Sequence, residues 1–242
     1  RQMCIRDRFY TEKIAYLPHS YFPNDSKKEI SETIPTRELA GLPNEGFVFC
    51  CFNNSYKISP DIFRVWMRIL NAVQGSVFWL SEMNASAIRN LLREADTAGV
   101  NPNRLIFASK TQRLADHLAR HRLADLFLDT LPYNAHTTAS DSLWAGVPVL
   151  TCLGKSFAGR VAASLLNAID MPELIASTLE QYEKIALSIA SHEGQLITLK
   201  EKLRRNRLTK PLFDSRGFTQ NMEALYSTMW NRYQKGLKPS HI

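Results

Sequence analysis

Residues 46–60 read GFVFCCFNNSYKISP, a stretch that changes from apolar to polar in its middle and ends at a proline. The uninterrupted apolar run from Phe47 to Phe52 is typical of a strand that is buried on both faces. Pro60 suits the first turn of a helix, where its missing N–H is not needed. Apolar residues follow it at helical spacing, namely Ile62, Val65, Trp66, Ile69 and Leu70. The stretch therefore predicts a strand, a polar loop and a helix in succession.

The same alternation continues along the chain. Further apolar runs predict strands at 76–80, 104–108, 125–129 and 147–151. Helical patterns lie between and after them, near 85–98, 111–122, 138–145 and 159–168. Strands that alternate with helices predict an α/β fold, a Rossmann-like parallel sheet with helices on both faces. Ligands in such folds bind beyond the carboxyl ends of the strands, so the polar loops there are the places to search.

The two ends of the chain differ from this middle part. Residues 1–40 have weak periodicity and several turn-forming residues, which predict an irregular segment with little core of its own. Beyond Met171 the patterns are helical, at 179–190, 192–206 and 219–234. We therefore expect an irregular segment over 1–40 and one domain over 41–242 that ends in a helical extension.

The composition is ordinary for a globular protein, since 45% of the 242 residues are hydrophobic and 22% are charged. The four cysteines, Cys4, Cys50, Cys51 and Cys152, show no C-x-x-C spacing and predict free thiols in a reducing compartment. No apolar run is long enough to span a membrane, and the first residues do not resemble a secretory signal. We therefore expect a cytoplasmic protein with no membrane partner.

The net charge of +7 raises the question of nucleic-acid binding. The basic residues are scattered, however, and their one dense patch, Lys200 to Lys210, lies on the polar face of a predicted helix. A solvated surface explains this patch better than a nucleic-acid stripe does, so we expect no nucleic-acid partner. The excess charge also raises the local concentration of anionic small molecules.

Two of the predicted strand-end loops carry cationic or titratable side chains. Lys57 follows the first strand and precedes the helix that begins near Pro60, where an ammonium group can neutralise a bound phosphate. The alternative is a polar loop whose lysine points into solvent. The loop at 109–113 leads to His117, which falls within a predicted helix near Arg113. A lone histidine in that position is more often a boundary residue than a ligand.

The loop after the fourth predicted strand holds the densest set of hydrogen-bonding side chains. Thr138 and Asp141 have the spacing of a capping box, an interpretation that needs only these two residues. It leaves Asn134, His136 and Thr137 unexplained. Adjacent hydroxyls at a helix start, together with its free N–H groups, form a cradle for an anion. Asp141 should face away from such an anion, and a ribose hydroxyl would suit it better.

Absent motifs narrow the function further. The chain has no G-x-x-x-x-G-K-[ST], no G-x-G-x-x-G after a strand and no G-x-S-x-G elbow. It also has no Asp-x-Asp pair that would hold a metal diphosphate. The sequence thus favours a site for a nucleotide diphosphate with no metal and no other cofactor, in which a lysine and a helix dipole replace the cation.

Four stretches, in this order, resemble the O-GlcNAc transferases, the TPR-linked protein glycosyltransferases, and their bacterial branch most. They are 52–58 (FNNSYKI), 123–130 (LADLFLDT), 136–148 (HTTASDSLWAGVP) and 160–164 (RVAAS). The resemblance covers roughly Phe9 to Tyr233 and does not include Arg1–Arg8, which indicates an artificial or truncated boundary. It implies the carboxyl-terminal half of a GT-B fold, with 1–40 as a remnant of the inter-domain region. The amino-terminal catalytic half, the general base and the TPR repeats would lie upstream.

The resemblance also implies roles for single residues. Lys57 would be the catalytic residue that contacts the diphosphate, with Asn54 near it. His117 would pack on the uridine. Leu114 stands where a donor-contacting lysine is usual, so Arg113 would substitute for that lysine.

The remaining implied roles belong to the loop after the fourth predicted strand. His136, Thr137 and Thr138 would hold the phosphates, in the same polar turn as Asn134. Asp141 would bind the ribose. Tyr133 would lie beside the sugar, where animal members have a cysteine.

The reaction implied by the resemblance moves N-acetylglucosamine from UDP-GlcNAc to serine or threonine hydroxyls of acceptor proteins, with inversion at the sugar. Two alternatives stay open, a non-catalytic UDP-sugar-binding module and a transferase of another UDP-hexose. UDP affinity with a weak salt dependence would favour all of these over a nucleic-acid-binding domain.

Overall fold

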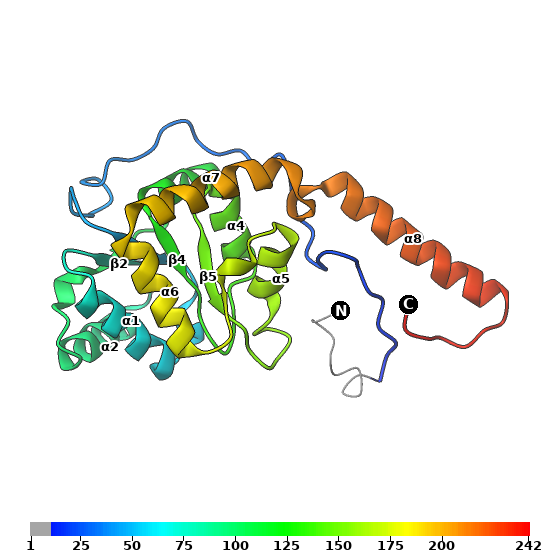
Figure 1. The fold of residues 1–242 in the computed structure, drawn as a ribbon, viewed down its shortest axis with the longest axis horizontal. Helices are drawn as coiled ribbons and strands as arrows, with labels where there is room; N and C mark the ends of the chain where they lie inside the picture. The colour runs from blue at the N-terminus through cyan, green and yellow to red at the C-terminus, as the bar shows by residue number, and fades with distance from the viewer. Residues whose placement is uncertain (1–10) are drawn as a thin grey trace.

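The computed structural model describes residues 11–242, and it confirms the predicted α/β class (Figure 1). A parallel sheet has the strand order β3-β2-β1-β4-β5-β6. Its strands are β1 (Val48–Cys51), β2 (Val77–Ser81), β3 (Leu105–Ala108), β4 (Leu126–Leu128), β5 (Val149–Cys152) and β6 (Ile175–Ala176).

Helices alternate with these strands and then follow them. The α-helices are α1 (Pro60–Ala72), α2 (Ala85–Thr97), α3 (Leu114–Arg120), α4 (Thr137–Ala145), α5 (Val161–Ala168), α6 (Leu179–Ser191), α7 (Glu193–Thr209) and α8 (Ser215–Gln234). The short 3-10 helices are η3 (Ser55–Lys57), η4 (Pro102–Arg104), η5 (His121–Leu123), η6 (Pro172–Leu174) and η7 (Pro211–Phe213).

The strand order reverses between β1 and β4, which lie side by side in the centre of the sheet. The chain winds outward from β1 to β3 on one side and from β4 to β6 on the other. α1 packs against α6, while α3, α4 and α5 pack against one another in turn. Loops that leave β1 and β4 therefore diverge to opposite faces and open a crevice at the carboxyl edge of the sheet.

The first strand and helix form as the apolar pattern predicts. All four residues of β1 are fully buried, which explains why the run has no polar member. The Ser59 side chain caps α1 by accepting a hydrogen bond from the Ile62 N–H, and Pro60 occupies the first turn. α1 buries Trp66 against Phe78 of β2, with 4.6 Å between the ring centroids. Each such side chain contributes about 1.5–3 kcal/mol by leaving water.

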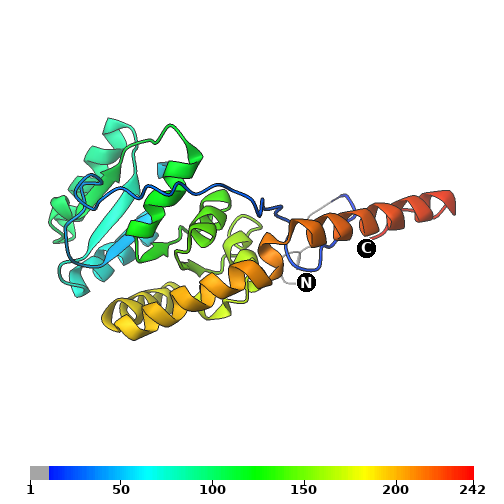
Figure 2. The same ribbon diagram turned by 90° about the horizontal axis from the view of Figure 1, so that it is seen from above.

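Residues 11–46 contain no helix or strand. The dark blue start of this segment lies on the side of α8, and the lighter blue remainder runs along the body of the domain (Figures 1 and 2). Several hydrogen bonds fix this segment to the domain. The Asn24 side chain donates to the Leu212 carbonyl over 3.0 Å, and the Ser31 N–H donates to the Ala115 carbonyl over 3.1 Å. The indole of Trp144 in α4 donates to the carbonyl of Lys28 over 3.0 Å.

The last helix, α8, projects away from the body in both views (Figures 1 and 2) and contains no buried residue. Beside it, the two ends of the described chain pair through their backbones. The Tyr16 N–H donates to the Ile242 carbonyl over 2.8 Å, and the Ile242 N–H donates to the Ile14 carbonyl over 3.1 Å.

Several elements differ from the sequence prediction in their bounds, and one was not predicted. α3 begins at Leu114 instead of 111, because the Arg113 backbone is extended. α8 begins four residues earlier than predicted, where the Asp214 side chain accepts a hydrogen bond from the Gly217 N–H over 2.9 Å. The two-residue strand β6 was not predicted, because two residues are too few to show a periodicity.

The structure bears on the predicted free thiols and on the predicted absence of a membrane-spanning segment. Cys50, Cys51 and Cys152 are buried free thiols, as predicted, whereas Cys4 and Arg1–Arg8 lie outside the described residues. Within 11–242, no helix combines the length and the apolar character that crossing a bilayer requires.

Candidate functional site

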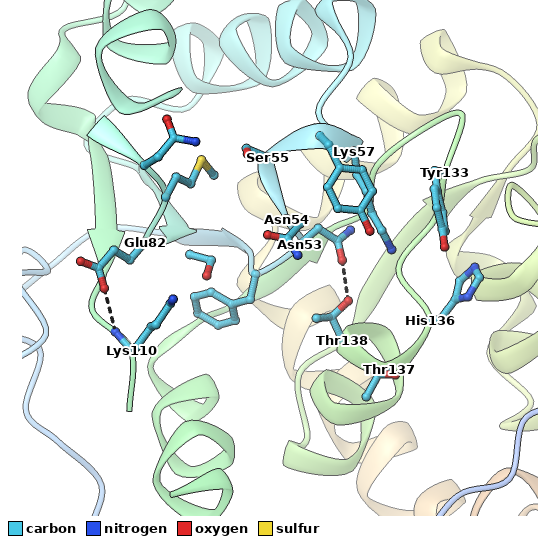
Figure 3. Close-up of a pocket in the computed structure, with 15 residues that line it drawn as sticks. Asn53, Asn54, Ser55, Lys57, Glu82, Lys110, Tyr133, His136, Thr137 and Thr138 are labelled. Carbon is cyan, nitrogen blue, oxygen red and sulfur yellow. Dashed lines mark hydrogen bonds between the residues drawn. The ribbon is translucent and has the colours of Figure 1, made fainter. Parts of the chain in front are cut away.

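A cavity of about 870 Å³ lies at the carboxyl edge of the sheet, within the size range of small-molecule sites (Figure 3). Three groups of residues line it, and each comes from a strand-end loop. They are Phe52–Lys57 after β1, Ser81–Asn84 at and after the end of β2 with Lys110 after β3, and Tyr133 with His136–Thr138 after β4. The reversal of strand order between β1 and β4 places the first and third groups opposite each other.

Lys57 ends the short helix η3 and reaches across to the loop after β4. Its Nζ donates to the Asn134 carbonyl over 3.0 Å and lies 4.0 Å from the centroid of the Tyr133 ring. Burial lowers the pKa of the Lys57 ammonium, and the negative charge of Asp129 partly opposes that shift. The ammonium therefore lies where an anion in the cavity would meet it. The alternative of a solvent-directed lysine is not what the structure shows.

Aromatic rings form the rim next to this ammonium. Tyr133 lies between Tyr56 and His136, with ring centroids 6.2 Å and 5.2 Å away. Burial lowers the pKa of His136, and a ring nitrogen lies 3.4 Å from the Ala158 carbonyl. The single N–H of the neutral ring donates to that carbonyl, so the ring gains an N–H for a ligand when it takes up a proton.

The first turn of α4 forms the floor of the same part of the cavity. Thr137 and Thr138 line it, and the residue before them, His136, makes no side-chain cap. The Thr138 hydroxyl donates to the Asn53 side-chain oxygen, as the dashed line in Figure 3 shows. The capping-box interpretation of Thr138 and Asp141 is therefore wrong, because neither side chain caps the helix. The start of α4 keeps its N–H groups and its partial positive charge available to an anion.

The opposite wall was not predicted from the sequence. It consists of Ser81, which ends β2, and of Glu82, Met83 and Asn84, which follow it. The Glu82 carboxylate accepts a hydrogen bond from the backbone N–H of Lys110 over 3.2 Å. These residues also lie at the carboxyl ends of predicted strands. That position was the signal that could have identified them, since nothing in their identity is distinctive.

Asn54 and Asn134, both predicted as site residues, differ in their position relative to the cavity. Asn54, predicted as a ligand residue, lines the cavity. Asn134 is fully buried, and its side chain donates to the Thr130 carbonyl over 2.8 Å. Asn134 therefore meets the site through its backbone carbonyl, which holds Lys57, and does not line the cavity.

His117 and Arg113 do not line the cavity either. The His117 ring packs against Phe52, a lining residue, and against His121, with centroids 5.5 Å and 4.6 Å away. Burial, aided by the charge of Arg120, lowers the pKa of His117 to about 4. Arg113 is exposed and pairs with Glu29 over 3.3 Å. The implied contacts of His117 and Arg113 with the donor remain predictions.

Asp141 lies in α4, buried to 5% exposure, and is not among the lining residues. Its Oδ1 accepts a hydrogen bond from the Lys28 ammonium over 2.6 Å. Lys28 belongs to the irregular segment 11–46, and no pattern in the sequence linked it to α4. The implied contact of Asp141 with a ribose remains a prediction.

The loop after β5 packs against the polar turn that contains Asn134 and His136. The Asn134 N–H donates to the Ala158 carbonyl over 3.0 Å. A side chain at Gly159 would place its Cβ 2.7 Å from the Pro132 carbonyl, so only glycine permits this approach. Among residues 11–242, no group of three or more histidine, cysteine, aspartate or glutamate side chains could hold a metal ion.

Residues 26–222 match the sequence profile of glycosyl transferase family 41. The chain belongs to this family. The resemblance inferred from the four sequence stretches is thereby confirmed.

Two curated relatives carry related names. The chain is 40% identical over 239 residues to the probable UDP-N-acetylglucosamine–peptide N-acetylglucosaminyltransferase SEC of Arabidopsis thaliana, with 96% of this chain and 24% of that protein covered. It is 35% identical over 212 residues to a UDP-N-acetylglucosamine–peptide N-acetylglucosaminyltransferase of Caenorhabditis elegans, with 88% and 18% covered. The chain thus spans about a quarter or less of the length of these relatives.

Solved structures agree with this assignment. A mutant of the Thermobaculum terrenum O-GlcNAc transferase superposes with a TM-score of 0.84 at 33% identity, covering 95% of this chain and 44% of that one. An Anabaena protein solved with UDP and glucose matches with a TM-score of 0.56 at 12% identity, which shows a shared fold alone. The fold is that of GT-B glycosyltransferases, of which this chain matches about half.

Proposed function

We propose that this chain is the nucleotide-sugar-binding half of an inverting protein O-linked N-acetylglucosaminyltransferase. It would bind UDP-GlcNAc and serve the transfer of GlcNAc to serine and threonine hydroxyls of proteins. The observation that carries the proposal is the convergence of the Lys57 ammonium and the start of α4 on one cavity. Membership in family 41 and the printed names of the relatives support the choice of donor.

The proposed chemistry is a displacement at the anomeric carbon of the sugar. The acceptor oxygen forms a bond to that carbon as the bond to the β-phosphate oxygen breaks, and UDP leaves. The acceptor proton passes to a base that this chain does not supply. Because the departing diphosphate gains charge in the transition state, a fixed ammonium and a helix start beside it lower the barrier.

In this proposal each cavity residue has a defined task. Lys57 compensates the charge that builds on the leaving group. The phosphates accept hydrogen bonds from the Thr137 hydroxyl, from the protonated ring of His136 and from the free N–H groups in the first turn of α4, that of Thr138 included. Asn54 lies next to them, while Tyr133 faces the sugar. No metal is required, because the cations and dipoles of the chain itself meet the diphosphate.

One observation favours a second candidate, a transferase of another UDP-hexose. The Tyr133 ring lies 4.0 Å from Lys57 Nζ and narrows the space beside the diphosphate position. A sugar without an N-acetyl group needs less room there. A non-catalytic UDP-sugar-binding module remains the third candidate, since the chain spans only part of its relatives.

Calorimetric titration of this chain with UDP, UDP-GlcNAc and UDP-glucose tests the proposal. We expect binding of UDP, tighter binding of UDP-GlcNAc than of UDP-glucose, and no change when EDTA is added. Tighter binding of UDP-glucose would favour the second candidate. Absence of UDP binding, or affinity for RNA that falls steeply with salt, would contradict the proposal. Transfer by a protein that also carries the amino-terminal half separates an enzyme from a binding module.

We also propose that the protein works in the cytoplasm. The free buried thiols Cys50, Cys51 and Cys152 support a reducing compartment. Detection of the protein by cell fractionation, with a cytoplasmic and a periplasmic marker as controls, tests this.

A further inference from the structure

Asp129, the first residue after β4, is a buried carboxylate that the proposed reaction does not use. Only 1% of the residue is exposed. Its Oδ1 accepts hydrogen bonds from the backbone N–H groups of Thr130 over 2.7 Å and of Ala135 over 2.6 Å. Its Oδ2 accepts from the Thr151 hydroxyl of β5 over 2.6 Å. Burying a charge is unfavourable unless donors surround it, so this arrangement indicates a specific role for the carboxylate.

The two backbone bonds close a loop. Thr130 and Ala135 are the first and last residues of 130–135, and one oxygen atom binds both of them. The loop between them presents Tyr133 and the Asn134 carbonyl to Lys57. Asp129 therefore fixes the wall that faces the ammonium, because the loop cannot open without leaving this oxygen.

A second connection runs from the same carboxylate to α4. The Asn53 amide lies 3.4 Å from Asp129 Oδ1 and donates to the Thr130 hydroxyl over 2.8 Å. The oxygen of that amide accepts the hydroxyl of Thr138, which lines the cavity. The position of the Thr138 hydroxyl is thus set by Asn53, and the orientation of Asn53 is set by Asp129 and Thr130.

The surroundings of Asp129 shift the pKa of its carboxyl in opposite directions. Burial raises the pKa of its carboxyl to about 7, and the hydrogen bonds from Thr151, Ala135 and Thr130 oppose that shift. The Lys57 ammonium also lowers this pKa. The other titratable groups that face it are Cys51, Cys152 and Tyr182, whose hydroxyl donates to the Asp129 carbonyl over 3.0 Å.

We propose that Asp129 is a positioning residue of the donor site, which holds loop 130–135 closed and, through Asn53, fixes the Thr138 side chain in the first turn of α4. This inference rests on the proposed function. Asp129 would not touch the bound UDP-sugar itself. It would decide whether the groups that bind the UDP-sugar are in place.

Isosteric replacement separates this role from simple loss of the fold. In Asp129→Asn, the amide oxygen can still accept from both backbone N–H groups. Thr151 can turn its hydroxyl hydrogen away, so that its oxygen accepts from the new NH2 group. We expect its UDP dissociation constant to stay within about 3-fold of the parent value, because the geometry is kept. Asp129→Ala should weaken UDP binding at least about 10-fold, since a displaced loop misplaces the contacts.

Thr151→Val is the matched control. It removes one hydrogen bond of Asp129 on the side away from the loop, so it should lower the melting temperature but leave UDP affinity unchanged. Asn53→Ala breaks the connection to Thr138 and leaves the two backbone bonds of Asp129 intact. It should weaken UDP binding by about 5-fold or more, and it should also lower the melting temperature, because buried partners lose a hydrogen bond. This variant also decides the matter if Asp129→Ala does not fold.

Hydrogen exchange gives a readout that does not depend on UDP. The amide hydrogens of Thr130 and Ala135 should exchange faster in Asp129→Ala than in the parent. Their exchange rates should be unchanged in Thr151→Val. The inference would be overturned if the alanine variants exchanged these amides and bound UDP as the parent does. It would also be overturned if Asp129→Asn bound UDP as weakly as Asp129→Ala. Failure of the parent protein to bind UDP would instead count against the proposed function, with the exchange data still testing the loop.

Discussion

The Lys28 ammonium lies 2.6 Å from Asp141 Oδ1, which joins the irregular segment 11–46 to the first turns of α4. The side chains are only 17% and 7% exposed, so water screens this pair poorly. The same α4 supplies Thr137 and Thr138 to the cavity. A segment with no helix or strand therefore neutralises a carboxylate within the helix that we propose binds the diphosphate.

Replacing Lys28 and replacing Asp141 should destabilise the protein by different amounts. Lys28→Met leaves the Asp141 carboxylate buried without a partner and should destabilise the protein by about 3 kcal/mol. Asp141→Asn should destabilise it less, because the longer lysine side chain can turn toward water. The double variant should recover part of the loss in urea denaturation. Additive losses would show that the two side chains do not interact.

UDP titration of Asp141→Asn tests the implied ribose contact separately. If Asp141 grips the ribose, UDP affinity should fall clearly, and Lys28→Met should lower it less. If Asp141 only anchors the segment, the affinity of the folded variant should match that of the parent. Melting curves of the same samples separate the two results.

Lys57→Ala should reduce turnover by at least about 100-fold in a protein that also carries the amino-terminal half, as for the loss of one preorganised donor. Donor binding should weaken much less, because the ammonium matters most as charge builds on the leaving group. Lys184→Ala, which removes an exposed lysine outside the cavity, is the control. Near-normal turnover of Lys57→Ala, or loss of parent activity on chelation, would contradict the mechanism.

The free energy of unfolding should depend on pH, because the two buried histidines and Asp129 change it in opposite directions. Burial lowers the pKa of His117 to about 4 and of His121 to about 3. The unfolded chain therefore takes up protons first as the pH falls below 6.5, which destabilises the fold. For Asp129, with its pKa raised to about 7, the folded state takes up the proton first, so stability contributed by this group rises as the pH falls from 7 to about 4.

Asp129→Asn removes the second contribution and leaves the histidines in place. The variant should lose stability more steeply than the parent between pH 7 and pH 4, as measured by urea denaturation at several pH values. His117→Gln should have the opposite effect and flatten the decline. Parallel curves for parent and Asp129→Asn would show that Asp129 does not titrate in this range.

The exposed face of α8 should drive association of this chain. Tyr226, Met229, Trp230 and Tyr233 are between 41% and 73% exposed, and exposed apolar patches of this kind promote contact between molecules. Light scattering at increasing concentration should show association, and Met229→Ser with Trp230→Ser should reduce it. A monodisperse monomer at high concentration would contradict this expectation.

The sequence alone predicted most of the secondary structure and the fold class. Buried parallel strands are short apolar runs, and the helices between them have one apolar face, so both leave a periodicity that can be read directly. The cavity at the carboxyl edge of the sheet was expected as well, because Lys57 and His136–Thr138, which line it, come soon after two such strands. These predictions depend only on residues that are close together in the chain.

The tertiary structure decided everything that depends on distant residues coming together. Lys28 meets Asp141 across 113 positions, and Asn53 reaches Thr138 across 85. The capping-box interpretation was wrong for this reason, since a local pattern cannot show that Thr138 and Asp141 have partners elsewhere. Asp129 likewise resembles any strand-end aspartate until the loop folds back over it. Periodicity records which side of an element is buried, whereas the partner of a buried polar group is set by how the elements pack, and only the folded chain contains that information.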